Sequence, residues 1–176
     1  GRMKTLILMR HAKSSWKHPE LKDHERGLNK RGKKDAPRMG KLLNDNELVP
    51  QRILTSTAER SRMTVEAVAG EMHFTGEVSY LDSLYMAEPD IYLELLSLMP
   101  DDLERILVVG HNPGLEGLLQ ILSGRVESLS TAAVAYLSLP IHSWKEIRAH
   151  QEVGELVALW TPHDTKDEKE AKVEKE

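Results

Sequence analysis

The sequence contains no cysteine among its 176 residues. This absence excludes disulfide bonds, thiolate nucleophiles and metal sites built on cysteine. Aromatic residues are also scarce, at 5%, so the core is expected to consist mainly of Leu, Ile, Val, Ala and Met. The apolar runs are far shorter than the ~18–20 residues of a membrane-spanning helix, and no signal segment opens the chain. We therefore expect a cytoplasmic protein with no membrane partner.

Nucleotide-binding motifs and internal repeats are absent as well. The sequence has no GxxxxGK[ST] phosphate loop and no GxGxxG fingerprint, so nucleotide-dependent chemistry lacks its usual support. A count of 24 basic and 28 acidic residues gives a net charge of −4, which does not favour a nucleic-acid partner. Basic side chains nevertheless concentrate between Lys22 and Arg38. This segment is either a solvated helix face or a positive rim that attracts anionic substrates.

Length and composition indicate one compact domain. The chain is 40% hydrophobic and 30% charged, which is typical of globular proteins. We expect the domain to span residues 3–163, and we interpret Gly1-Arg2 as the remnant of a cleaved expression tag. Residues 164–176 are mostly charged and are expected to form a solvated tail or an exposed helix outside the core.

Short apolar runs alternate with amphipathic stretches along most of the chain. Buried strands are predicted at residues 5–9, 52–55, 78–81 and 105–110. Helices are predicted at 32–46, from a cap at Ser56 or Thr57 to Gly70, at 91–99 and from Pro113 to Leu122. This alternation predicts an α/β fold with parallel strands and right-handed crossovers. Residues 132–139 and 155–160 have strand patterns with no clear helix between them, so they are expected to add antiparallel strands.

Two of the predicted strands end at a histidine, in Arg10-His11 and in His111-Asn112. Ligands of α/β sheets bind at the carboxyl ends of parallel strands, so both histidines lie where a site would form. A third strand is followed by Arg60, which can reach the same edge from the start of a helix. One such histidine alone is more often a hydrogen-bonded loop residue. Two histidines and two arginines together suit phosphoryl transfer, because guanidinium groups bind pairs of phosphate oxygens and stabilise transition-state charge.

Four segments resemble motifs of the histidine phosphatase superfamily. RHAKSSW, from Arg10 to Trp16, resembles the RHG-type motif, with Ala12 in place of the usual glycine. STAERSRMT, from Ser56 to Thr64, resembles the SxxxRxxxT helix start, and VGHNP, from Val109 to Pro113, resembles the second histidine motif. DHERGLNKRG, from Asp23 to Gly32, is similar to the DxxRxLxxxG segment of the SixA branch, which contains phosphohistidine phosphatases.

The resemblance covers residues 3 to about 162 and implies the three-layer α/β/α sandwich of phosphoglycerate mutase-like proteins. It implies that His11 is the nucleophile, which would become a phosphohistidine before water releases the phosphate. Arg10, Arg60 and His111 would form the phosphate pocket, with His111 protonated beside the phosphate dianion. Ser14 and Asn112 either donate further hydrogen bonds to the phosphate or have turn and capping roles. No metal or other cofactor is implied.

The general acid is left open between Asp23 and Glu88. Asp23 is preferred because it lies in the polar loop after the nucleophile motif, whereas the residues around Glu88 depart from the pattern of the phosphoglycerate mutase branch. A phosphorylated imidazole can leave as a neutral ring, the conjugate base of a group with a pKa of about 6.5, but an alkyl phosphate must expel a far more basic alkoxide. A weak acid therefore favours phosphohistidine as the substrate. The short chain, with little room for lid insertions, favours a protein substrate.

Three other interpretations remain. The first is a small-molecule phosphomonoesterase of the same superfamily, for which Glu88 would be essential. The second is a phosphoprotein-binding module without hydrolysis, which has no need of a histidine in an attacking position. The third is a metal site, but the remaining histidines lie in polar contexts without an HExxH motif or closely spaced carboxylates. We interpret them as surface residues: His18, His24, His73, His142, His150 and His163.

Overall fold

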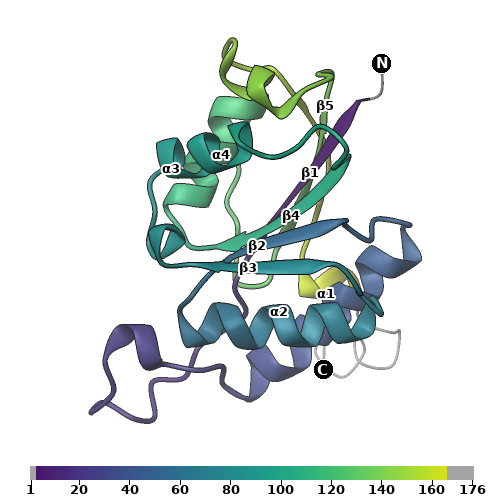
Figure 1. The fold of residues 1–176 in the computed structure, drawn as a ribbon. Coiled ribbons are helices and arrows are strands. Elements are labelled where there is room, and N and C mark those ends of the chain that lie inside the picture. Colours follow the sequence, from purple (N-terminus) through teal and green to yellow (C-terminus); the bar gives the residue numbers. More distant parts are fainter. Residues whose placement is uncertain (1–2, 166–176) are drawn as a thin grey trace.

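The computed structural model describes residues 3–165, which form a six-stranded sheet with helices on both faces (Figure 1). The strands are β1 (Lys4–Arg10), β2 (Arg52–Ser56), β3 (Glu77–Leu81), β4 (Arg105–Gly110), β5 (Val134–Leu139) and β6 (Glu155–Trp160). The α-helices are α1 (Lys30–Asp45), α2 (Glu59–Glu71), α3 (Pro89–Ser97) and α4 (Gly114–Ser123). Four 3₁₀ helices complete the described elements: η1 (Asp23–Glu25), η2 (Asp82–Leu84), η3 (Trp144–Arg148) and η4 (Pro162–Thr165).

The sheet has the strand order β3-β2-β4-β1-β5-β6. Strand β4 pairs in parallel with β1 and β2, and β2 pairs in parallel with β3. Strands β5 and β6 extend the sheet in antiparallel fashion. Helices α1 and α2 cover one face, and α3 and α4 cover the other (Figure 1). The predicted three-layer α/β/α sandwich, mostly parallel with antiparallel strands near its end, is confirmed.

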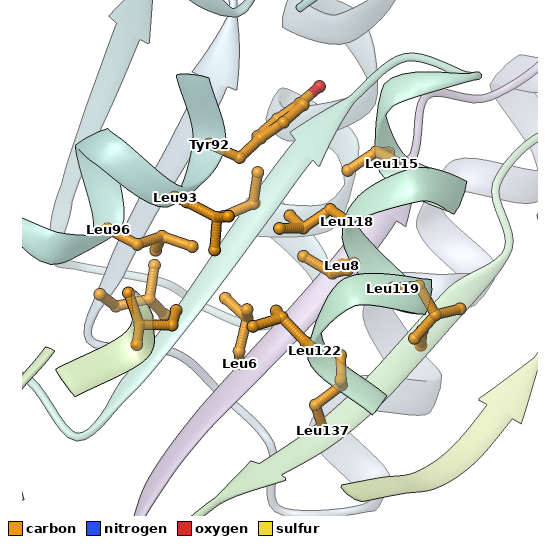
Figure 2. Packing of buried hydrophobic residues seen from close by; sticks show 14 of the residues in the cluster. Leu6, Leu8, Tyr92, Leu93, Leu96, Leu115, Leu118, Leu119, Leu122 and Leu137 are labelled. Atoms are coloured by element: carbon orange, nitrogen blue, oxygen red, sulfur yellow. The ribbon is translucent and has the colours of Figure 1, made fainter. Parts of the chain in front are cut away.

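The two faces of β1 explain why its sequence is continuously apolar. Leu6 and Leu8 pack in the core under α3 and α4, while Ile7 and Met9 pack in the opposite core under α1 and α2. Because successive side chains of a strand point to opposite faces, a strand covered on both sides has no polar alternation. Figure 2 shows the first core, in which Leu118 of α4 lies near Leu8 of β1.

The core is mainly aliphatic, as the composition predicted, with two large aromatic exceptions. Tyr92 and Trp144 are both fully buried, and each uses its polar atom. Trp144 Nε1 donates to the carbonyl of Leu103 at 2.6 Å, and the Tyr92 hydroxyl accepts from the backbone N–H of His111 at 3.3 Å. A buried aromatic side chain with a polar atom needs such a partner. Tyr92 thereby joins this core to the turn that carries His111.

The predicted cap of α2 is wrong. Ala58, and neither Ser56 nor Thr57, is the N-cap residue, and no side chain caps the helix. The Ser56 hydroxyl accepts from the N–H of Ala58 at 3.1 Å and lies 2.7 Å from His111 Nε2. A residue type that usually caps a helix therefore belongs to the polar cluster at the sheet edge.

The ends of the chain extend only partly into the described range. Pro162–Thr165 forms η4, which contacts α1, so Asp164 and Thr165 lie against the domain. The rest of the expected tail lies outside the described residues, at 166–176. The expected tag remnant, Gly1-Arg2, also lies outside them. Within residues 3–165, no helix is both long and apolar enough to cross a membrane.

A loop from Ser15 to Gly27 leaves the body of the protein after β1 and returns at the start of α1 (Figure 1, purple). Its base is closed by an antiparallel bridge between Ser14 and Leu28, and by the Ser15 N–H, which donates to the Gly27 carbonyl at 2.8 Å. Gly32, in the first turn of α1, touches the backbone just after His11: a Cβ on Gly32 would lie 2.2 Å from the Lys13 carbonyl oxygen. Helix α1 thus packs directly on the turn that follows the predicted nucleophile.

The first expectation concerns this contact. Gly32→Ala should destabilise the fold by about 1–3 kcal/mol, since overpacking against backbone forces a shift. Gly70→Ala is the matched control, because a Cβ there meets nothing within 4 Å. An alanine in a helix is favoured over glycine by about 0.5–1 kcal/mol. Urea unfolding should move the two midpoints in opposite directions, and a Gly32→Ala protein as stable as the wild type would contradict the packing argument.

Candidate active site

Three neighbouring strands deliver polar side chains to one edge of the sheet. His11 follows β1, His111 follows β4, and Arg60 lies in the first turn of α2, just after β2. A pocket of about 370 Å³ opens at this edge. All of the predicted site residues line it, namely Arg10, His11, Ser14, Asp23, Arg60, His111 and Asn112. Glu88 does not line it; it is exposed at the N-cap of α3.

The imidazole of His11 is oriented by its own turn. Its Nδ1 lies 2.8 Å from the carbonyl oxygen of Ala12. A carbonyl can only accept, so Nδ1 bears the proton of the neutral ring and Nε2 keeps its lone pair. Burial, followed by the charges of Arg60 and Arg10, lowers the pKa of His11 to about 4. His11 is therefore a neutral imidazole at pH 7, the state in which a histidine can act as a nucleophile.

The turn after His11 is tied to α2 through Thr64. The Ala12 N–H donates to Thr64 Oγ1 at 3.0 Å, and the Thr64 hydroxyl donates to the Arg60 carbonyl at 2.7 Å. Ala12 itself is fully buried and is not among the residues with positive φ. The backbone conformation at this position is therefore one that alanine can adopt, although the resembled motif has glycine there.

His111 presents one ring nitrogen to a serine and leaves the other without a partner. Its Nε2 lies 2.7 Å from Ser56 Oγ, and the Ser56 hydroxyl also accepts from the Ala58 N–H. The Nδ1 atom of His111 is buried and has no hydrogen-bond partner. In a protonated ring both nitrogens are donors. The rings of His111 and His11 are close, with centroids 5.1 Å apart.

Burial lowers the pKa of His111 to about 3, and neighbouring His11 and Arg60 act in the same direction. In the free protein His111 is therefore neutral at pH 7. The protonated form expected beside a phosphate dianion requires the phosphate, whose negative charge would raise this pKa. Anion binding and proton uptake by His111 are consequently coupled.

Arg10 also has a buried atom without a partner. Its Nη1 donates to the Leu129 carbonyl at 3.1 Å, but its Nε is buried and unpartnered. An unsatisfied buried donor costs about 1–3 kcal/mol. Arg10 and His111 line the same pocket, and a guanidinium group and a protonated imidazole are both suited to bind the oxygens of an anion.

Ser14 and Asn112 differ in what they can offer an anion. The Asn112 amide donates to the Leu129 carbonyl at 2.8 Å, and its buried Oδ1 is an acceptor, which an anion cannot use. The Ser14 hydroxyl accepts from Arg26 Nη1 at 2.8 Å, and its own proton can still be donated to an anion. Phosphate binding by these two residues stays a prediction.

Asp23 is bound by three side chains at once. Arg60 donates to its backbone carbonyl at 2.8 Å and to its Oδ2 at 3.0 Å. Arg26 donates to its Oδ1 from Nε at 3.2 Å and from Nη2 at 3.0 Å, and the Tyr85 hydroxyl donates to Oδ2. The hydrogen bond from Tyr85, with those from Arg26 and Arg60, holds the pKa of Asp23 below its usual range. Asp23 is therefore ionised in the free protein and has no proton to donate.

Several pocket residues were not predicted as site residues: Lys13, Trp16, Arg26, Met86 and Thr131. Arg26 had a signal, since it is the arginine of the DxxRxLxxxG segment, yet it was interpreted only as part of the basic stretch. It is 8% exposed and touches Asp23, Ser14 and Trp16. Met86, like the nearby Tyr85, had no signal, because both lie in the irregular segment between β3 and α3.

Comparisons with known proteins agree with this geometry. Residues 6–85 match the model of the histidine phosphatase superfamily (branch 1). An uncharacterized chloroplastic protein of Arabidopsis thaliana is 33% identical over an alignment of 150 residues, with 80% of this chain and 69% of that protein covered. The candidate phosphohistidine phosphatase SixA of Nakamurella multipartitia has a structure with a TM-score of 0.82 at 25% identity, covering 92% of this chain and 98% of its own. That of Agrobacterium tumefaciens gives 0.79 at 27% identity, with 92% and 100% covered.

The histidine pKa values can be measured by NMR titration of the free protein. We expect the ring signals of His11 and His111 to stay those of neutral imidazole down to about pH 5, well below the ordinary midpoint of about 6.5. The ¹⁵N shifts should identify His11 as the Nδ1–H tautomer. His11→Asn and His111→Asn proteins assign the signals, and a midpoint near 6.5 for His11 would contradict the buried, neutral state.

The position of Asp23 predicts an effect on anion affinity. Asp23→Asn removes a negative charge from Arg60 and should tighten the binding of inorganic phosphate by on the order of tenfold, since hydrogen bonds to charged groups contribute about 1.5–3 kcal/mol. Glu88→Gln makes the same change of charge outside the pocket and should leave the Kd unaltered. Calorimetric titration measures both. Weaker phosphate binding by Asp23→Asn would show that Asp23 orients Arg60 for phosphate and does not compete with it.

Proposed function

Because the chain belongs to the histidine phosphatase superfamily, we propose that it removes phosphoryl groups from phosphohistidine in proteins, through a covalent intermediate on His11. One observation carries this proposal. The neutral imidazole of His11, with an unprotonated Nε2, lines the same pocket as two arginines and a second histidine, Arg10, Arg60 and His111. A nucleophile beside groups that bind oxyanion charge is the arrangement that phosphoryl transfer requires.

In the first step, the lone pair of His11 Nε2 attacks phosphorus. The bond from phosphorus to the substrate's ring nitrogen breaks, and that nitrogen keeps the electron pair. If the substrate ring is already protonated on its other nitrogen, it leaves as neutral imidazole. Arg10, Arg60 and His111 would hold the phosphoryl oxygens, and the charge of the phosphoryl group would favour protonation of His111.

In the second step, water attacks the phosphorus of the intermediate, and the bond to His11 Nε2 breaks to give inorganic phosphate. The water must lose a proton. Asp23 is a carboxylate in the pocket, bound to Arg60 in the free protein. When the phosphoryl group binds Arg60, Asp23 loses part of the interaction that lowers its pKa, so it becomes able to accept this proton.

The protonation states support phosphohistidine over an alkyl phosphate. The pocket carboxylate, Asp23, is ionised and both pocket imidazoles are neutral in the free protein. Asp23 is therefore not a carboxylic acid ready to protonate a departing alkoxide, whereas a departing imidazole needs no such acid. Glu88, the acid required by the small-molecule alternative, lies outside the pocket. The SixA structures from Nakamurella multipartitia and Agrobacterium tumefaciens, at 25% and 27% identity, bear the name of the same activity.

The direct test measures phosphate release with EDTA present, from a phosphohistidine-bearing protein and from an alkyl phosphate ester. We expect the wild type to prefer phosphohistidine. His11→Ala should abolish release, because the proposed first step needs the lone pair of His11 Nε2. His142→Ala is the matched control, since His142 is exposed and follows β5 at the opposite edge of the sheet. Equal turnover by His11→Ala and the wild type would refute the proposal. A wild-type preference for the alkyl phosphate ester would contradict phosphohistidine as the substrate and favour a small-molecule phosphomonoesterase.

A further inference from the structure

We propose that Trp16 and Met86 form a subsite for the aromatic ring of the leaving group. This inference rests on the proposed function, and it concerns the part of the substrate that is not phosphate. Both residues line the pocket although they are strongly exposed, Trp16 by 76% and Met86 by 49%. Among the exposed large hydrophobic residues of the described chain, these two are the ones that line it.

Trp16 is held in place by a buried cation. The guanidinium carbon of Arg26 lies 3.6 Å from the centroid of the indole ring. Arg26 is itself fixed, since it donates to Ser14 Oγ, to the Ser15 carbonyl and to Asp23. The indole is thus a positioned, solvent-facing aromatic surface, which suits stacking against a second flat ring.

Met86 is held at the pocket by an unusual backbone conformation. Its φ of 52° lies in the left-handed region, which is costly for a residue other than glycine and concentrates at functional sites. The thioether sulfur lies 3.8 Å from Arg60 Nη2. A polarizable thioether makes favourable contacts with aromatic rings. Each exposed apolar side chain therefore rests on one of the two guanidinium groups that bind Asp23.

The direction of the reaction puts the leaving ring on this side of the pocket. In phosphoryl transfer the attacking and leaving atoms are roughly in line through phosphorus. The leaving ring then lies on the far side of phosphorus from His11, which is only 7% exposed, and hence toward the open mouth. Trp16 and Met86 are the exposed apolar groups of that mouth. An imidazole ring, flat and partly apolar, would make more favourable contacts with these side chains than ammonia or a hydrated alkyl group would.

Two small substrates with the same phosphoryl group test this. N-phosphoimidazole loses an aromatic ring, and phosphoramidate loses ammonia. We expect Trp16→Ala to lower kcat/KM for N-phosphoimidazole by about 3–10-fold more than for phosphoramidate, from the size of aromatic contacts. Met86→Ala should show the same selectivity to a smaller degree, and Trp16→Phe should restore most of the loss. Leu21→Ala is the matched control, because Leu21 is an exposed apolar residue of the same loop outside the pocket.

Equal losses on the two substrates in Trp16→Ala, or no loss on either, would overturn the subsite and leave the proposed function standing. If the wild type turned over neither substrate, the phosphatase proposal would fail and the subsite with it. Trp16→Ala should also bind inorganic phosphate within about twofold of the Leu21→Ala control, since the product has no ring to stack. A larger loss of phosphate affinity would mean that Trp16 acts only by supporting Arg26, which also contradicts the subsite.

Discussion

The hydrogen bond between His11 Nδ1 and the carbonyl of Ala12 determines what the rest of the site can do. It places the proton of the neutral ring on Nδ1 and the lone pair on Nε2. The Ala12 carbonyl is in turn fixed by its peptide neighbours, because the Ala12 N–H is bound by Thr64 and the next residue packs against Gly32 of α1. Two helices on the same face of the sheet therefore hold the tautomer of one imidazole. Their packing in the core is a condition for the chemistry at the edge.

Charge in the pocket is arranged for an incoming anion. Three arginines line it, Arg10, Arg26 and Arg60, against one carboxylate, Asp23, and the two imidazoles are neutral. The neutrality of His11 follows from burial and from the same cations that would bind phosphate. Asp23 bridges Arg26 and Arg60 in the free protein, so an anion that binds Arg60 changes the environment of Asp23. Anion binding and the proton affinity of Asp23 are thus linked through the guanidinium group of Arg60.

The sequence predicted the elements that depend on local pattern and failed on those that depend on tertiary contact. β1 and β4 were recognisable because strands buried on both faces have continuous apolar runs, and the strand ends placed His11 and His111 at one edge. The predicted cap of α2 is wrong because local propensity favours Ser56 as a cap, while its hydroxyl contacts His111, which follows a different strand, β4.

The partners of Asp23 were likewise invisible from the sequence. Arg60 and Tyr85 lie 37 and 62 positions from Asp23 along the chain, and no periodicity connects them. The position of Asp23 after the nucleophile motif suggested a proton donor, whereas its three donors keep it ionised in the free protein. Met86 could not be expected at the pocket either, since its backbone is in the left-handed region and methionine, unlike glycine or asparagine, does not indicate that conformation.

The most direct test of the account is the identity of the atom that bears phosphorus in the intermediate. The phosphorylated enzyme, made from ¹⁵N-histidine-labelled protein and stabilised at alkaline pH, can be examined for ¹⁵N–³¹P coupling by NMR. The account predicts coupling to Nε2 of His11, because Nδ1 is committed to the Ala12 carbonyl. Phosphorus on Nδ1 of His11, on His111 or on a residue outside the pocket would contradict it.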